Sequence, residues 1–207
     1  MGLVESRSAD IIASQHLNFA SSKLFNGNDN YRGRLFTVLR HPVDQVIVSY
    51  YNFINTSNAR AIEKMTLQQY ISSPHMQQNW LTHLLSNQSF LGGPVDEDDL
   101  NLAKEILRKK CLIGLSEKLD QSVDMFAKYF GWNEGLLVGE TKQCAAKLIN
   151  QSLEKTNSIY SKLVDQKYKV EYGSEIYNSI VLKNEIDIEL YWYAYDLHMA
   201  QLMQVNS

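Results

Sequence analysis

A continuous apolar run followed by an arginine and a proline constrains this chain more than any other feature of its sequence. The run covers residues 35–39 (Leu-Phe-Thr-Val-Leu) and leads through Arg40-His41-Pro42 into a second apolar segment that ends near Phe53. An uninterrupted run with β-branched and aromatic members is typical of a strand buried in a parallel sheet. Proline is tolerated in the first turn of a helix. We therefore predict a strand over 35–39, a turn, and a helix over 43–53.

The same alternation continues along the chain. Residues 111–115 predict a second buried strand, and a helix is expected before it, because carboxylates at 96–99 and cations at 108–110 match the helix dipole. A further helix is expected from 116 to 130. The last helix, 185–203, is expected to carry an apolar face formed by Ile186, Leu190, Tyr193, Ala194 and Leu197. Strands that alternate with helices predict an α/β fold with a parallel sheet.

The overall composition limits the class of protein. The 207 residues are interpreted as a single domain, 1–207, and the net charge of −3 lacks the basic excess of a nucleic-acid binder. No apolar run reaches the ~20 residues of a membrane span. Cys111 and Cys144 have no metal-ligand spacing, so we expect two buried thiols, with a disulfide as the alternative.

Arg40 is the residue best placed to bind a ligand. It follows the first predicted strand, and ligands of open α/β sheets bind at the carboxyl ends of the strands. Its guanidinium suits a phosphate, and the helix that begins next supplies free N–H groups and a favourable dipole. Ser49 on that helix could add a neutral hydrogen bond. The alternative is an arginine that pairs with a nearby carboxylate, and a surface serine.

The residues around Arg40 resemble a known motif. Leu-Arg-His-Pro-Val-Asp at 39–44, followed by Ser49-Tyr50, resembles the 3′-phosphate-binding motif of sulfotransferases that use 3′-phosphoadenylyl sulfate (PAPS). Later segments resemble, in the same order, parts of the Golgi-type carbohydrate sulfotransferases. These segments are Asn79-Trp80-Leu81, 98–107, 113–117, Phe130-Gly131-Trp132 and 184–191.

The resemblance implies a fold, a reaction and a set of site residues. The fold is a three-layer α/β structure in which helices flank a parallel sheet, as in nucleotide kinases. The reaction is transfer of a sulfuryl group from PAPS to a hydroxyl, with a glycan as the acceptor, no metal, and the Golgi lumen or membrane as the compartment. Arg40 and Ser49 would hold the 3′-phosphate. His16 would act as general base, because heparan- and uronyl-type members carry a histidine at a comparable place.

The chain departs from the family pattern in two respects. Relatives place the serine eight positions after the arginine, whereas Ser49 is nine positions after Arg40, so that Val48 competes for the serine position unless the turn or a π-bulge absorbs one residue. The loop that wraps the 5′-phosphosulfate is not recognisable before His16. We expect an N-terminally incomplete sulfotransferase domain; a non-catalytic relative and a substitute loop are the alternatives. Activity of the chain therefore stays open.

Aromatic residues near the predicted cofactor site allow two interpretations. Tyr50, Tyr51 and Phe53 could stack on a sugar, but at helical spacing we expect them in the core. His41 is expected to shape the turn. The leading hypothesis is a carbohydrate-type sulfotransferase domain, and the alternative is a binding or interaction module that keeps the scaffold.

Overall fold

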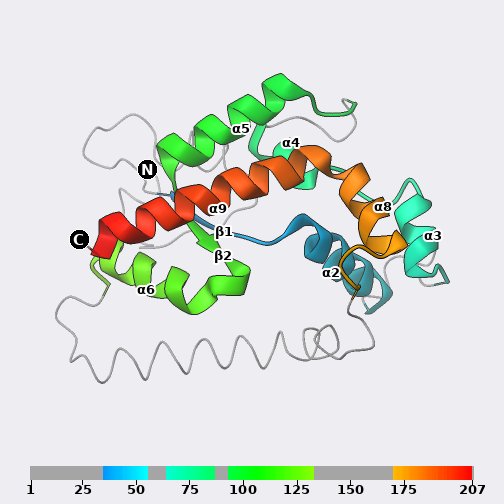
Figure 1. Cartoon of the computed structure of the whole chain (residues 1–207), viewed down its shortest axis with the longest axis horizontal. Coiled ribbons are helices and arrows are strands. Elements are labelled where there is room, and N and C mark those ends of the chain that lie inside the picture. Colours follow the sequence, from blue (N-terminus) through cyan, green and yellow to red (C-terminus); the bar gives the residue numbers. More distant parts are fainter. Residues whose placement is uncertain (1–34, 56–63, 87–92, 133–169, 207) are drawn as a thin grey trace, which may run out of the picture.

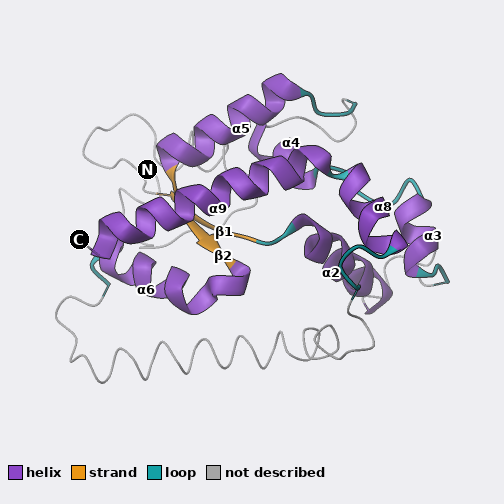
Figure 2. Cartoon of the chain, in the orientation of Figure 1, coloured by secondary structure: helices purple, strands orange, loops and turns teal. Residues whose placement is uncertain are grey.

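The structure is a computed structural model that describes residues 35–55, 64–86, 93–132 and 170–206 (Figures 1 and 2). These residues form a mostly helical assembly around a short parallel sheet. In chain order the elements are β1 (Leu35–Leu39), α2 (Pro42–Asn55), α3 (Leu67–Ser72), α4 (Trp80–Ser86), α5 (Glu97–Lys110), β2 (Cys111–Leu115), the 3-10 turn η2 (Ser116–Lys118), α6 (Leu119–Phe130), α8 (Glu175–Lys183) and α9 (Glu185–Asn206).

The sheet pairs β1 with β2 in parallel, as the sequence predicts. Leu35 lies opposite Cys111 and Leu39 opposite Leu115, so the carboxyl ends of the two strands coincide. This pairing agrees with the α/β class. The described residues contribute two strands to the sheet, and they do not by themselves form a three-layer parallel sheet.

Helices cover the two faces of β2. Ile113 and Leu115 are fully buried against α5 and α9, whereas Leu112 packs against Met125 and Phe126 of α6. This division follows from the strand period of two, which sends alternate side chains to opposite faces. Figure 1 shows α9 running along the sheet between α5 and α6. All five residues of β2 are buried, which confirms the prediction for 111–115.

The prediction that 35–39 is a buried strand is only partly right. Leu39 is buried, but Phe36 and Val38 are 39% and 42% exposed. Aromatic rings at the end of α6 and just after it pack on the face of β1 that carries Phe36 and Val38. The ring centroid of Phe36 lies 4.9 Å from that of Phe126 and 5.8 Å from that of Trp132. An apolar run alone does not distinguish a strand covered on both faces from one covered on a single face.

A second core lies beside the sheet, between α2, α3 and α8. Val43, Val46 and Tyr50 of α2 pack there against Tyr70 and Ile180. The Tyr50 hydroxyl donates to the Met65 carbonyl oxygen at 2.7 Å. The core interpretation of the aromatic residues in α2 is therefore confirmed for Tyr50.

Helix α5 follows its sequence signals closely. Asp96 is its N-cap and accepts hydrogen bonds from the backbone N–H groups of Asp98 and Asp99, which is the capping arrangement expected of these residues. Cys111 comes directly after α5 and is buried, as predicted, and burial raises the pKa of its thiol to about 11. Cys144 lies outside the described residues.

The expected core face of α9 is partly wrong. Leu190 and Ala194 are buried, and the half-buried Ile186 and Leu197 pack against the same core, as predicted. Tyr193 is half-buried and does not belong to this core cluster. The buried set also includes Asp187, Tyr191 and His198. Apolar and aromatic residues surround this helix on several sides, so hydrophobicity does not determine which side turns inward.

Candidate functional site

Arg40 lies at the carboxyl edge of the sheet. Because Leu39 and Leu115 are opposite each other, Arg40 and the Ser116-Glu117 turn follow the two strands at the same edge. Arg40 is half-buried, and helix α2 begins two residues later. The structure thus places Arg40 at the carboxyl end of β1, as the sequence predicts, and it brings Glu117, the end of the resembling segment 113–117, to the same edge.

The charges around Arg40 are mixed. Asp44 lies in the first turn of α2 and is exposed. Partial desolvation of its carboxyl group raises the pKa of Asp44, and the positive charges of His41 and Arg40 oppose this rise. Glu117 adds to the upward shift of the Asp44 pKa. The guanidinium therefore has a carboxylate in its electrostatic neighbourhood, which favours the alternative that Arg40 partly serves a structural pairing.

His41 shapes the turn between β1 and α2. Its carbonyl oxygen accepts from the Gln45 backbone N–H at 2.9 Å, and its ring nitrogen Nδ1 lies 3.4 Å from the Val43 backbone nitrogen, in position to accept that N–H. The ring packs edge-on against Tyr191, with 5.0 Å between centroids. Tyr191 in turn donates its hydroxyl hydrogen to Glu117, so α9 helps to fix the turn.

The environment of His41 makes the stability depend on pH. Burial lowers the pKa of His41 below its ordinary value, and the charges of Asp44 and Glu117 oppose this only in part. On acidification the unfolded chain therefore takes up a proton at His41 before the folded chain does, and stability is lost as pH falls below about 6.5. When the pH is lowered from about 7 to about 5, we expect the free energy of unfolding to fall less for His41→Gln than for wild type.

Urea denaturation at both pH values measures this difference. His75→Gln, at an exposed position, is the matched control for the loss of a histidine. A pH dependence of His41→Gln equal to that of wild type would contradict the assignment.

Ser49 does not share the side of α2 that carries Asp44. Helix α2 is continuous from Pro42 to Asn55, so each residue turns the side chain by about 100°. Val48 then lies within about 40° of the direction of Asp44, whereas Ser49 points about 140° away from it. The helix contains no π-bulge among its residues, and the nine-residue spacing from Arg40 is not absorbed there.

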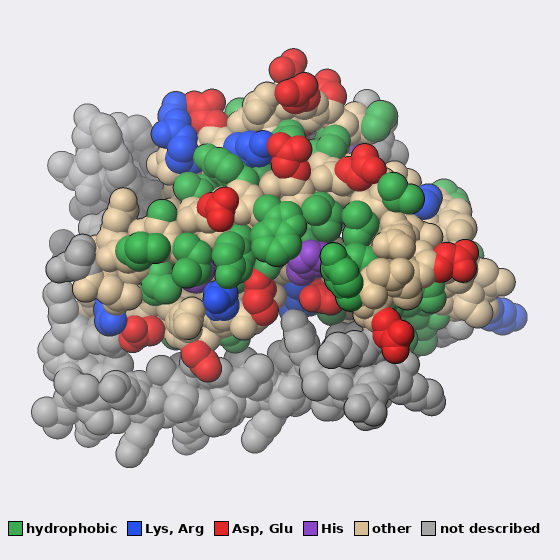
Figure 3. All heavy atoms as spheres, viewed as in Figure 1, with side chains coloured by type: hydrophobic (Ala, Val, Ile, Leu, Met, Phe, Trp, Pro, Cys, Tyr) green, Lys and Arg blue, Asp and Glu red, His purple; other side chains and the backbone are tan. Residues whose placement is uncertain are grey.

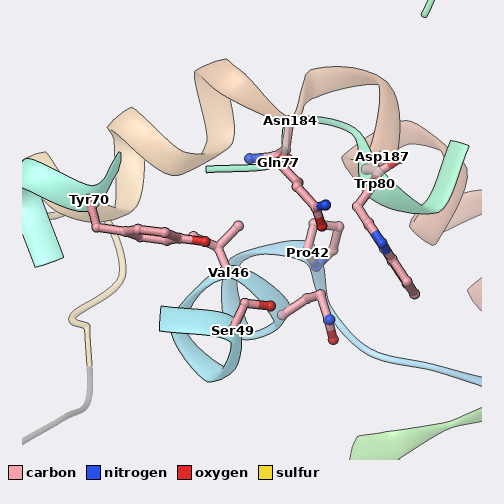
Figure 4. A pocket seen from close by; sticks show the side chains of 9 residues that line it. Pro42, Val46, Ser49, Tyr70, Gln77, Trp80, Asn184 and Asp187 are labelled. Carbon is pink, nitrogen blue, oxygen red and sulfur yellow. The ribbon is translucent and has the colours of Figure 1, made fainter. Parts of the chain in front are cut away.

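Ser49 instead lines a pocket between α2, the segment before α4, and the start of α9 (Figure 4). Gln45 and Val46 contribute from α2, and Gln77 and Trp80 from the opposite wall. Arg40 is not among the lining residues. The space open to the centre of a water-sized sphere is about 20 Å³, which is close to the room that one water molecule needs. Of the two predicted phosphate-binding residues, Arg40 thus lies at the sheet edge, whereas Ser49 lines this pocket.

The starts of two helices hold the wall of this pocket together. The carboxylate of Asp187 in α9 accepts from the Leu81 and Thr82 backbone N–H groups of α4, each at 2.8 Å, and from the Thr82 hydroxyl at 2.7 Å. In return, the Asn79 side-chain oxygen accepts from the Asp187 backbone N–H at 3.1 Å. Asn184 completes the exchange by accepting from the Asn79 backbone N–H at 2.9 Å. We call these residues the helix clamp.

Burial is the main influence on the charge of the clamp. Asp187 is only 4% exposed, and burial raises the pKa of its carboxyl group, while the hydrogen bonds from Thr82 and Leu81 oppose the rise. Because three donors already engage the carboxylate, Asp187 is a structural acceptor and not an open ligand for a cation.

The remaining predictions concern the general base, a metal, a membrane span and a basic surface. His16, the predicted general base, lies outside the described residues. In the described part of the chain, no group of three or more potential metal ligands comes together, and no helix is long and apolar enough to cross a membrane. On the face shown in Figure 3, basic side chains are scattered among acidic and apolar ones and do not form one patch.

Comparison with known proteins finds no relative of this chain. No family model matches the chain, and no curated protein or solved structure matches it significantly. The functional interpretation therefore rests on the residues and the geometry described above.

Proposed function

We propose that the chain is a PAPS-type sulfotransferase domain in which Arg40 holds the 3′-phosphate of the nucleotide. The observation that carries this proposal is the place of Arg40, directly after β1, at the carboxyl edge of a parallel strand pair and before a helix. A guanidinium there can form two hydrogen bonds with a phosphate, and the start of α2 adds a favourable dipole.

The arrangement of the resembling segments gives further support. Asn79-Trp80-Leu81 and the start of α9 are far apart in the sequence, yet they are joined by the helix clamp. The segment 113–117 contains the end of β2 and lies beside Arg40. Three of the segments that resemble one family, 79–81, 113–117 and 184–191, are thus held by the strand pair and the helix clamp.

The proposal includes features that reach beyond the described residues. It takes a three-layer parallel sheet as the complete fold, and the exposure of Phe36 and Val38 is compatible with further cover on that face of β1. It takes His16 as the general base, PAPS as the sulfuryl donor and a carbohydrate hydroxyl as the acceptor. The phosphate site that we propose rests on Arg40, because α2 turns Ser49 away from the side of Asp44.

A second candidate is a non-catalytic binding module on the same scaffold. The observation that favours it is the negative charge near Arg40, since Asp44 interacts electrostatically with the guanidinium and would compete with an anionic ligand for it. A module of this kind would keep the fold and the helix clamp without turning over PAPS.

The first test is binding of adenosine 3′,5′-bisphosphate to the purified chain, measured by calorimetry. We expect saturable binding that Arg40→Ala weakens by about 2 kcal/mol, or roughly thirtyfold, on the scale of a lost charged hydrogen bond. Arg108→Ala, an exposed arginine at the end of α5, is the matched control and should bind like wild type.

Either result is decisive for the nucleotide site. A folded wild-type chain that does not bind the nucleotide would overturn the role of Arg40 and favour the module without a cofactor. Where binding is found, turnover with PAPS separates the enzyme from the non-catalytic module.

A further inference from the structure

The pocket beside Ser49 has no charged group available to a ligand. Its carboxylate, Asp187, is engaged by three donors of α4, and the side-chain amide of Asn184 is engaged at both ends, by the Asn79 N–H at 2.9 Å and by the Ile180 carbonyl oxygen at 2.8 Å. No lysine, arginine or histidine is among the lining residues. An anion therefore finds no positive charge in this pocket, and a cation finds no open carboxylate.

Neutral hydrogen-bonding groups remain at the pocket. Ser49 brings a hydroxyl, and Gln45 and Gln77 bring amides, and none of these three side chains makes a hydrogen bond within the described residues. Figure 4 shows the side chains of Ser49 and Gln77 reaching into the space between their two segments. Burial raises the pKa of Tyr70, another lining residue, to about 12, so it also stays neutral. Hydroxyls and amides each offer a donor and an acceptor, which is what a hydroxyl group requires.

The size of the space limits what can enter. A volume of about 20 Å³ for the centre of a water-sized sphere accommodates one water molecule or one hydroxyl group, but not a sugar ring. Trp80 lines the same pocket and packs in part against the main core, and the part of its indole that stays exposed offers an apolar surface against which the C–H face of a ring can pack.

We propose that this pocket receives a single hydroxyl group of a neutral sugar whose ring stays at the mouth against Trp80. The inference rests on the proposed function for the choice of a carbohydrate, and it assigns Ser49 to the sugar and not to the phosphate. The pocket would then position one unit of the acceptor while Arg40 holds the nucleotide.

The test uses the full chain and methyl β-D-glucopyranoside as the probe, with saturation-transfer NMR as the readout. Binding is expected in the millimolar range, where a single sugar unit contributes little free energy. Gln77→Met keeps the length of the side chain and removes its hydrogen bonds, and the loss of one neutral hydrogen bond predicts about fivefold weaker binding. Ser49→Ala is expected to have an effect of similar size.

Matched variants separate this inference from the nucleotide site. Gln78→Met changes the neighbouring exposed glutamine, which does not line the pocket, and should leave sugar binding unchanged. Arg40→Ala should also leave sugar binding unchanged, while Gln77→Met should leave binding of adenosine 3′,5′-bisphosphate unchanged. Absence of saturation transfer with the folded wild-type chain, or equal binding by Gln77→Met and Gln78→Met, would overturn the sugar subsite without touching the role of Arg40.

Discussion

Replacing Asp187 with alanine is expected to lower the free energy of unfolding by about 3 kcal/mol or more. The change removes an acceptor from two backbone N–H groups and one hydroxyl of α4, and all three lie where the Asp187 side chain is only 4% exposed. Each buried donor that loses its partner costs about 1–3 kcal/mol, and a single water in the adjacent pocket has only two lone pairs for the three donors. The start of α4 and its contact with α9 should loosen together.

Two variants on the same helix make this prediction specific. Asp187→Asn keeps the shape and one acceptor oxygen but turns an amide group toward donors, so an intermediate loss is expected. Asp196→Ala removes an exposed carboxylate farther along α9 and should cost less than about 0.5 kcal/mol. Urea denaturation of the three variants gives the comparison. A loss for Asp187→Ala no greater than that for Asp196→Ala would refute the helix clamp.

The helix clamp could not be predicted from the sequence. It joins Asn79 and Thr82 to Asn184 and Asp187, more than a hundred residues later in the chain. Each of these residues by itself looks like an ordinary helix start, because asparagine and aspartate are common at such positions. Which helix start each side chain serves depends on how α4 and α9 pack, and no local pattern contains that information.

Elements with local causes were predicted well. The capping residues of α5, the apolar run of β2 and the proline at the start of α2 each act within a few residues, and the structure has all three elements where the sequence places them. The exposure of β1 and the rotation of α9 depend instead on which neighbours cover them. The candidate site divides in the same way: Arg40 at the sheet edge follows from the strand, whereas Glu117 becomes its neighbour only through the pairing of β1 with β2.

Gly114 illustrates a requirement that only the packed structure reveals, and Gly114→Ala is expected to cost about 3 kcal/mol of stability. A Cβ atom at this position would lie 2.7 Å from Cζ of Phe126 and 3.0 Å from Cβ of Ser122. Neither side chain can withdraw freely. The Phe126 ring is 2% exposed and packs on Phe36, and the Ser122 hydroxyl accepts from the Leu115 backbone N–H at 2.9 Å.

A double-mutant cycle with Phe126→Leu tests whether this clash is the cause. Leucine lacks the ring atom nearest to the added methyl group, so the alanine at 114 should cost less in that background, with a coupling energy of about 1 kcal/mol or more. Urea denaturation of the two single variants and the double variant provides the four free energies. If the losses of stability of the two single variants add up to that of the double variant, β2 accepts a methyl group beside α6. The close approach of the strand to this helix would then not be the reason for a glycine at position 114.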